Sequence, residues 1–259
     1  MLIREDDLGV LAIGQPSHAW LSGQLARAWG NPRFGAVEPL EEVCLAAEQH
    51  DVGWDARDLA PLLDHDSGRP CSFMQMPLEI HLGLFTDGPR RMLSQSRYAA
   101  LLVSLHGWRL YDRRDLDGSA PEAAAAIRRF LDGQRTFQAQ RLRELRADPA
   151  TEPWSRDEVV ERNSMLIWTW DYLSLALCLG WDTATARAVP TAEGHVDLEL
   201  RRASAAGTWQ LDPWPFRCTR LEVRCEGRRL TERFEDEPEL RAALEHARWE
   251  TLELRLEPV

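Results

Sequence analysis

The stretch AAEQHDVGWD, residues 46–55, places His50 directly before Asp51 in the chain. Imidazole and carboxylate groups are both ligands for divalent transition metals, so the pair raises the question of a metal site. Adjacent His and Asp residues also occur by chance on solvated helix surfaces. The choice between these alternatives depends on where the two side chains point, and therefore on the elements that carry them.

Two expected helices each direct a histidine inward. In the helix expected from Pro16 to about Trp29, His18 lies on an apolar stripe at the helical repeat of about 100° per residue. The helix expected from about Pro39 through Asp51 places His50 on a similar stripe, with Asp51 one step to its side. The apolar partners on the two stripes are Leu21, Leu25 and Trp29, and Val43, Ala47 and Trp54. An inward histidine by itself is more typical of a hydrogen-bonded core residue than of a ligand.

A third expected helix carries a carboxylate in an apolar environment. The segment SMLIWTWDYLSLALCLGW is apolar nearly all round, which is typical of a helix buried in the middle of a bundle, and it contains Asp171. A buried carboxylate is unfavourable unless it is paired, protonated or bound to a metal. An Arg partner is the ordinary alternative. Together, His18, the His50–Asp51 pair and Asp171 form a four-ligand set suited to Mn, Fe, Zn or Mg.

These segments resemble known families. The order His, His-Asp, Asp on successive helices resembles the HD-domain superfamily, which comprises all-α metal-dependent hydrolases. The chain is more closely similar to a bacterial family of unknown function, DUF3891, over nearly its whole length. The segments that carry this second resemblance are GQPSHAWLSGQLARAW, AAEQHDVGWD, GRPCSFMQMP, YAALLVSLHG and LDPWPF. The resemblance supplies a fold and a site rather than a reaction.

The HD resemblance implies a role for particular residues. The implied ligands are, in chain order, His18, His50, Asp51 and Asp171. Superfamily members with two metals have further histidines between the central pair and the distal Asp. Here the candidates are His81 and His106, of which His106 shares an apolar helix face with Ala99, Leu102 and Val103.

A metal at this site would support hydrolysis of a phosphoester by activating a bound water and polarising a phosphoryl oxygen. Asp51 would bridge the metal and orient the nucleophile. Arg57 and Arg97, the nearest arginines in the sequence, would bind the phosphate, although solvated surface charge is their ordinary explanation. An oxygenase with two irons is the alternative, and it would engage both His81 and His106. In a non-catalytic alternative, the His/Asp set is a buried polar network that binds no metal.

Composition narrows the function classes. The net charge of −11 argues against nucleic acid or an anionic membrane as the main partner, and the expected ligand is a small molecule. All 31 basic residues are arginine, which excludes Schiff-base chemistry and a Walker-type phosphate loop. Five scattered cysteines and the lack of a signal peptide favour the cytoplasm. A homo-oligomer is compatible with the sequence.

Periodicity predicts two regions. Residues 1–185 are expected to form an HD-like helical domain, with helices near 94–106, 121–147 and 156–180 and a long loop over 61–77. After Pro190 apolar and polar side chains alternate, so residues 186–259 are expected to form a small antiparallel sheet with one helix at EPELRAALEHA. The expected fold class is therefore mainly α, and α+β overall. Eleven tryptophans are many for this length, and one or two are expected to wall a pocket.

Overall fold

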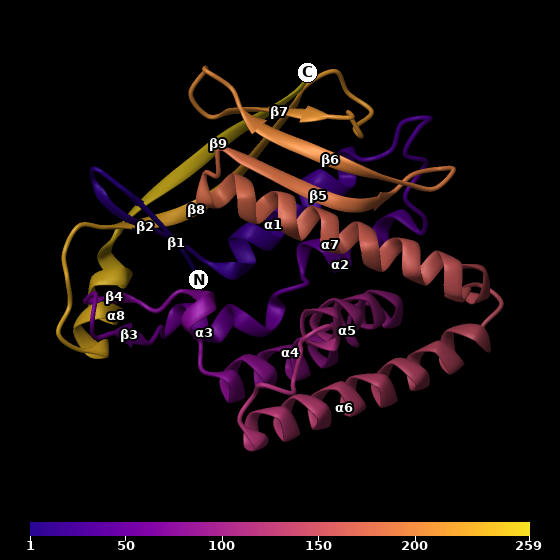
Figure 1. The fold of residues 1–259 in the computed structure, drawn as a ribbon, viewed down its shortest axis with the longest axis horizontal. Helices are drawn as coiled ribbons and strands as arrows, with labels where there is room; N and C mark the ends of the chain where they lie inside the picture. Colours follow the sequence, from indigo (N-terminus) through magenta and orange to yellow (C-terminus); the bar gives the residue numbers. More distant parts are fainter.

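The computed structural model describes residues 1–259, and its largest feature is a seven-stranded mixed sheet (Figure 1). The strand order is β1-β2-β8-β9-β7-β6-β5. All neighbouring strands are antiparallel except β7 and β9, which are parallel. The strands are β1 (Leu2–Asp6), β2 (Gly9–Ile13), β5 (Thr183–Pro190), β6 (His195–Arg202), β7 (Thr208–Asp212), β8 (Leu221–Leu230) and β9 (Arg248–Pro258).

The sheet corrects the predicted fold class. The protein is α/β rather than mainly α with a small C-terminal sheet, because a hairpin of β1 and β2 from the N-terminal region joins the sheet beside β8. The predicted boundary at residue 185 falls inside β5. The all-α architecture implied by the HD resemblance is therefore wrong for this chain. The predicted C-terminal strands and their helix are confirmed as β6 to β9 and α8 (Glu237–His246).

Helices cover one face of the sheet in successive layers (Figure 1), and α8 packs against the opposite face beside β2 and β8. In the first layer, α1 contacts β8 and α7 contacts β5 and β1. Helix α2 packs against α1 and α7, α5 packs against α2 and α7, and α4 and α6 pack on α5. The helices are α1 (Gln15–Ala28), α2 (Leu40–Glu48), α3 (Asp55–Leu59), α4 (Leu78–Met92), α5 (Arg97–Asp112), α6 (Pro121–Arg146) and α7 (Asp157–Leu179). At β6 only one face is covered, since Leu198 and Leu200 are buried while the alternate side chains are exposed.

Helix α7 is central because most of its side chains from Asn163 to Cys178 are buried. It packs against α1, α2, α5 and the sheet. It ends at Gly180, whose φ of 70° is the left-handed conformation that terminates many helices. Helix α1 begins with Pro16 in its first turn, where the missing N–H of proline is not needed. These two helices therefore form where the sequence predicts them.

The segment between Pro61 and Met92 differs from the prediction. The expected loop contains the short hairpin β3 (Leu63–Asp64) and β4 (Arg69–Pro70) and a 3-10 turn at Phe73–Gln75. Helix α4, which was not predicted, follows. Two glycines and Pro89 weaken its helical signal, but Leu82 and Phe85 are buried and hold it in place. No helix of the protein combines the length and the apolar character that a bilayer span requires.

Candidate metal centre

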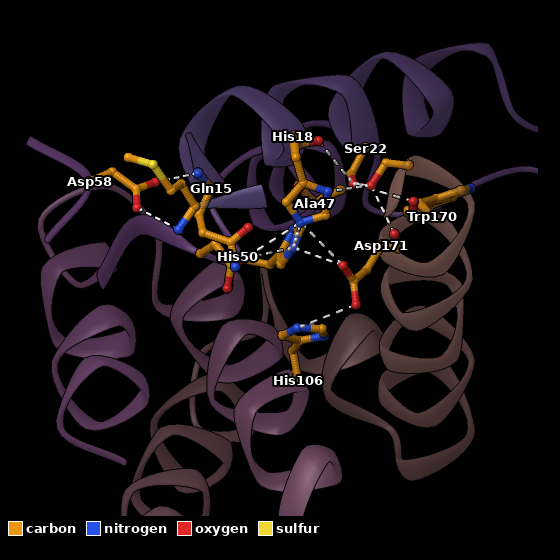
Figure 2. A network of polar contacts seen from close by, with 12 residues as sticks. Gln15, His18, Ser22, Ala47, His50, Asp58, His106, Trp170 and Asp171 are labelled. Carbon is orange, nitrogen blue, oxygen red and sulfur yellow. Dashed lines mark hydrogen bonds and ion pairs between the residues drawn. The ribbon is translucent and has the colours of Figure 1, made fainter. Parts of the chain in front are cut away.

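Four elements bring five side chains of the types that can bind metals to one point, and Figure 2 shows His18, His50, His106 and Asp171 among them. The contributing elements are α1, the turn after α2, α5 and α7, and the side chains are His18, His50, Asp51, His106 and Asp171. All five residues are at most 9 % exposed. Two groups have ligand atoms that lie within 4.8 Å of one another, namely His18, His50 and Asp51, and His50, His106 and Asp171.

The turn that carries His50 and Asp51 begins earlier than predicted. Helix α2 ends at Glu48, so the pair lies in a turn that leads into a 3-10 turn at Val52–Trp54. The imidazole of His50 contributes to this ending, since its Nδ1–H donates to the carbonyl oxygen of Ala47 at 2.8 Å. A carbonyl only accepts, so the proton lies on Nδ1 and the other nitrogen, Nε2, faces the site.

The acceptor atoms of the site face one another closely. The Nε2 atoms of His18 and His50 are 3.2 Å apart, and Asp171 Oδ1 lies 3.3 Å from each. Asp51 Oδ2 lies 3.5 Å from His18 Nε2 and 3.6 Å from His50 Nε2. The second oxygen of Asp171 points to His106, at 3.8 Å from Nε2, so this carboxylate lies between the two upper histidines and His106 (Figure 2).

A serine pair fixes the orientation of His18. The hydroxyl of Ser174 donates to the Asp171 backbone carbonyl at 2.8 Å, so its oxygen accepts from His18 Nδ1–H at 2.7 Å. The hydroxyl of Ser22 donates to the same Ser174 oxygen at 2.8 Å. Both serines are fully buried. Ligating histidines characteristically hold their outer ring nitrogen in this way, which orients the ring and leaves Nε2 for the metal.

The donor set fits a divalent cation. With both Nδ1 atoms protonated, the site contains two imidazole lone pairs and two carboxylates in contact, and these groups repel one another unless positive charge lies among them. Asp51 Oδ1 and His106 Nδ1 are buried and have no hydrogen-bond partner. Nitrogen and carboxylate donors without a Cys cluster suit a catalytic ion rather than a structural zinc.

The pKa values of the upper two histidines, His18 and His50, also indicate that the site favours positive charge. Burial opposes the charged form of His50, but the Asp51 charge and the contacts with Asp171 outweigh it and raise the pKa to about 9. The pKa of His18 is also raised, because contacts with Asp171 and Asp51 outweigh burial. The contacts with His18 and His50 hold the pKa of Asp171 well below its usual value despite burial. Burial and the His50 charge lower the pKa of His106 to about 4.

A cavity of about 380 Å³ opens onto the centre. Its polar wall includes His18, Asp51, His106 and Asp171. The remaining wall is mostly apolar, and the side chains that form it are Trp54, Phe73, Met74, Met76, Leu78, Phe85, Leu110 and Leu175. A cavity with a small number of polar groups at one end and apolar walls elsewhere is typical of a small-molecule site.

The other predicted site residues have different places. His81 lines the cavity but belongs to neither group of ligand atoms, and its Nδ1 contacts the hydroxyl of Tyr111 instead. Arg57 and Arg97, predicted to bind phosphate, do not line the cavity. Arg97 forms an ion pair with Asp148 on the surface, because it opens α5 at the end remote from His106.

Two cavity residues were missed by sequence reasoning. Arg114 is the only arginine that lines the cavity, and Tyr111 lies next to it. Neither has a sequence signal, because the order YDRRD resembles an ordinary charged helix end. Ser174 could have been found, since it follows Asp171 by three residues on the same helix. Of the eleven tryptophans, only Trp54 lines the cavity, while Trp168 packs on His106 at a ring distance of 5.9 Å.

Comparisons with known proteins give a family but no activity. The model of the family described as "Protein of unknown function (DUF3891)" matches residues 1–232. No curated protein and no solved structure matches the chain. The predicted resemblance to DUF3891 is thereby confirmed, whereas the comparisons give no support to the resemblance to the HD-domain superfamily.

Proposed function

The chain belongs to the family of unknown function DUF3891, so its activity has to be inferred from the site, and we propose that it is a metal-dependent hydrolase of a phosphoester. The observation that carries the proposal is the convergence of His18 Nε2, His50 Nε2 and Asp171 Oδ1 within 3.3 Å of one another beside a cavity. Asp51 and Asp171 supply two negative charges, which match one divalent cation.

Different residues around the site would have different roles in such a reaction. A divalent cation supplies an activated water near neutral pH and polarises a phosphoryl oxygen. His18 and His50 would hold it through Nε2, with Asp171 and Asp51 as the carboxylate ligands. Asp51 also has a free oxygen, Oδ1, with which it can accept a proton or orient a nucleophile.

The hydrolase, the di-iron oxygenase and the non-catalytic alternative differ in the number of metal ions that the protein would bind. His106 and the second oxygen of Asp171 could hold a second ion. The di-iron oxygenase alternative requires His81 as a further ligand, and His81 belongs to neither group of clustered ligand atoms. The non-catalytic alternative requires that no metal binds.

Metal content tests the proposal. Mass spectrometry of purified wild-type protein, reconstituted with Mn, Fe, Zn or Mg, is expected to give one ion per chain. His50→Ala and Asp171→Ala are expected to lose the ion while circular dichroism shows a folded protein. His65→Ala, a change at an exposed histidine, is the matched control and is expected to retain it. Two irons per chain would favour the oxygenase, and a metal-free wild type would contradict the hydrolase.

Once the ion is established, the reaction is tested with phosphoesters. The wild type is expected to hydrolyse a chromogenic phosphomonoester or phosphodiester with a rate that depends on the metal, and Asp51→Asn is expected to lose most of that rate. A protein that binds one ion stoichiometrically yet hydrolyses neither class would contradict the phosphoester part of the proposal and leave the metal site standing.

A further inference from the structure

His81, Tyr111 and Arg114 form a second polar group in the cavity, separate from the proposed metal ligands. His81 lies on α4, while Tyr111 and Arg114 lie at the end of α5. All three line the same cavity as Asp51 and Asp171. The group brings hydrogen-bond donors into a space whose other polar wall is a cluster of acceptors.

The contact between Tyr111 and His81 fixes which nitrogen of His81 carries a proton. Tyr111 is 1 % exposed, and its hydroxyl has His81 Nδ1 as its partner. The buried Tyr111 hydroxyl has no other protein partner, and its hydrogen is satisfied when it donates to His81 Nδ1, so Nδ1 accepts. The proton of the neutral imidazole therefore lies on Nε2, which has no protein partner. Burial lowers the pKa of His81 to about 4, so that the ring stays neutral.

The imidazole ring is held firmly in this orientation. It packs edge-on against Trp54 at a centroid distance of 5.3 Å and against Phe85 at 4.9 Å. The ring of Tyr111 is a third aromatic neighbour, at a centroid distance of 5.7 Å. These three contacts and the hydrogen bond leave the imidazole little freedom to rotate. His81 thus presents a fixed N–H donor to a ligand in the cavity, without the cost of ordering it on binding.

Arg114 adds a charge to this donor. Its guanidinium carbon lies 4.4 Å from the ring centroid of Tyr111, so stacking holds the charge at the mouth of the cavity. Arg114 is the only arginine among the lining residues. A divalent cation would balance Asp51 and Asp171, which leaves the charge of Arg114 as the net charge of the lining. In a chain of net charge −11, this is a local attraction for an anion.

We propose that His81 and Arg114 form an oxyanion-binding wall, and that the cavity takes a small molecule with an apolar body and an anionic oxygen group, a phosphate or a carboxylate. The wall would bind through His81 Nε2–H and the guanidinium, while the apolar side chains contact the body of the molecule. The inference rests on the proposed function for the identity of the reacting group, whereas the wall itself uses no metal ligand.

Calorimetric titration with phenylphosphonate, which phosphoester hydrolysis cannot consume, tests the wall. The titration is made on metal-loaded protein and on protein freed of metal by a chelator. His81→Phe keeps a ring and removes the donor, and Arg114→Gln removes the charge. Each is expected to raise the Kd about ten- to a hundredfold, as the loss of a hydrogen bond to a charged group implies. Arg113→Gln, at an exposed neighbour that does not line the cavity, is expected to leave the Kd unchanged.

A second measurement separates the proposed role from mere packing. Nitrogen NMR of the histidines is expected to show His81 as the neutral Nε2–H form in the wild type. Tyr111→Phe is expected to abolish that preference and to weaken phenylphosphonate binding in a protein that remains folded. If Tyr111→Phe leaves both the tautomer and the Kd unchanged, the contact is structural and the inference is wrong.

The outcomes distinguish the wall from the metal site. Binding that depends on His81 and Arg114 in protein without metal supports the wall even if no metal binds, in which case only the hydrolase proposal fails. Binding that requires metal and is indifferent to both variants overturns the wall. Benzoate, with the same ring, identifies the anion: tighter binding than phenylphosphonate assigns the wall to a carboxylate and contradicts the phosphoester. Failure of both probes to bind overturns the inference.

Discussion

Replacing Ser174 by alanine tests whether the buried serine pair tunes the metal site. In the wild type, the Ser174 oxygen accepts from His18 Nδ1–H at 2.7 Å and from the Ser22 hydroxyl at 2.8 Å. Ser22 can redirect its hydrogen to the Trp170 carbonyl, which lies 3.3 Å away. His18 has no such substitute, so Ser174→Ala leaves one buried donor without an acceptor, which costs about 1–3 kcal/mol of unfolding free energy.

The same change is expected to weaken metal binding. Without Ser174, the proton of His18 is free to lie on Nε2, where a metal must displace it, and the ring loses the contact that orients it. Loss of such a partner raises the metal Kd about ten- to a hundredfold while the stoichiometry stays at one.

Competition against a chromophoric chelator gives the Kd, and denaturant unfolding of the metal-free protein gives the stability. Ser155→Ala is the matched control, because Ser155 is also fully buried and bonds one backbone carbonyl, that of Glu152, outside the site. It is expected to lose stability alone. An unchanged metal Kd in Ser174→Ala, or an equal change in both variants, would refute the reasoning.

Two further predictions concern protons and packing. Metal binding must displace the proton that His50 holds with a pKa of about 9. The metal affinity is therefore expected to rise with pH by about tenfold per unit for each proton displaced and to level off above the His50 pKa. A metal Kd that does not change between pH 6.5 and 8 in competition titrations would contradict this. A side chain at Gly53 would place its Cβ 2.2 Å from the Leu84 carbonyl oxygen, so Gly53→Ala is expected to lower the unfolding free energy by about 3 kcal/mol or more. Gly133→Ala, in open space on α6, is expected instead to raise it by about 0.5–1 kcal/mol. Equal denaturation midpoints for the two variants would show that the turn after α2 does not depend on this close approach.

Helical periodicity located much of the site because three of its residues lie on strongly patterned helices. His18 and Asp171 face inward on α1 and α7 as predicted, and His106 does so on α5. His50 points to the same centre for another reason. Its helix ends before it, and the bond from its own ring to Ala47 orients the imidazole. A periodic pattern cannot reveal this, because the hydrogen bond from a side chain to a nearby backbone carbonyl depends on the local conformation of the turn.

The fold was harder to predict because strand pairing is not local. The hairpin of β1 and β2 has only five residues in each strand, and β2 pairs with β8, more than two hundred residues later. Nothing in the N-terminal sequence indicates that β8 is the strand with which β2 pairs. Strand β5 was missed for a related reason, since Thr183, Thr185 and Arg187 alternate with alanines that carry little apolar signal. The predicted sheet was therefore too small.

The phosphate-binding arginines were predicted from their closeness in sequence to the proposed ligands, and this criterion chose the wrong residues. Arg97 begins α5 and Arg114 follows the end of the same helix, so the two lie a helix length apart. Of the two, only Arg114 shares the cavity with the proposed metal ligands. The sequence distance to His106 is similar for both, nine residues for Arg97 and eight for Arg114, which is why direction along the helix, rather than proximity, decides the role.

Anomalous diffraction from crystals of the metal-loaded protein tests the central claim most directly. A single strong peak is expected about 2.0–2.2 Å from His18 Nε2 and His50 Nε2, with an oxygen of Asp171 at a similar distance. A peak found only at the exposed histidines His195 or His246, or a buried cluster that stays free of metal at saturating concentration, would contradict the claim.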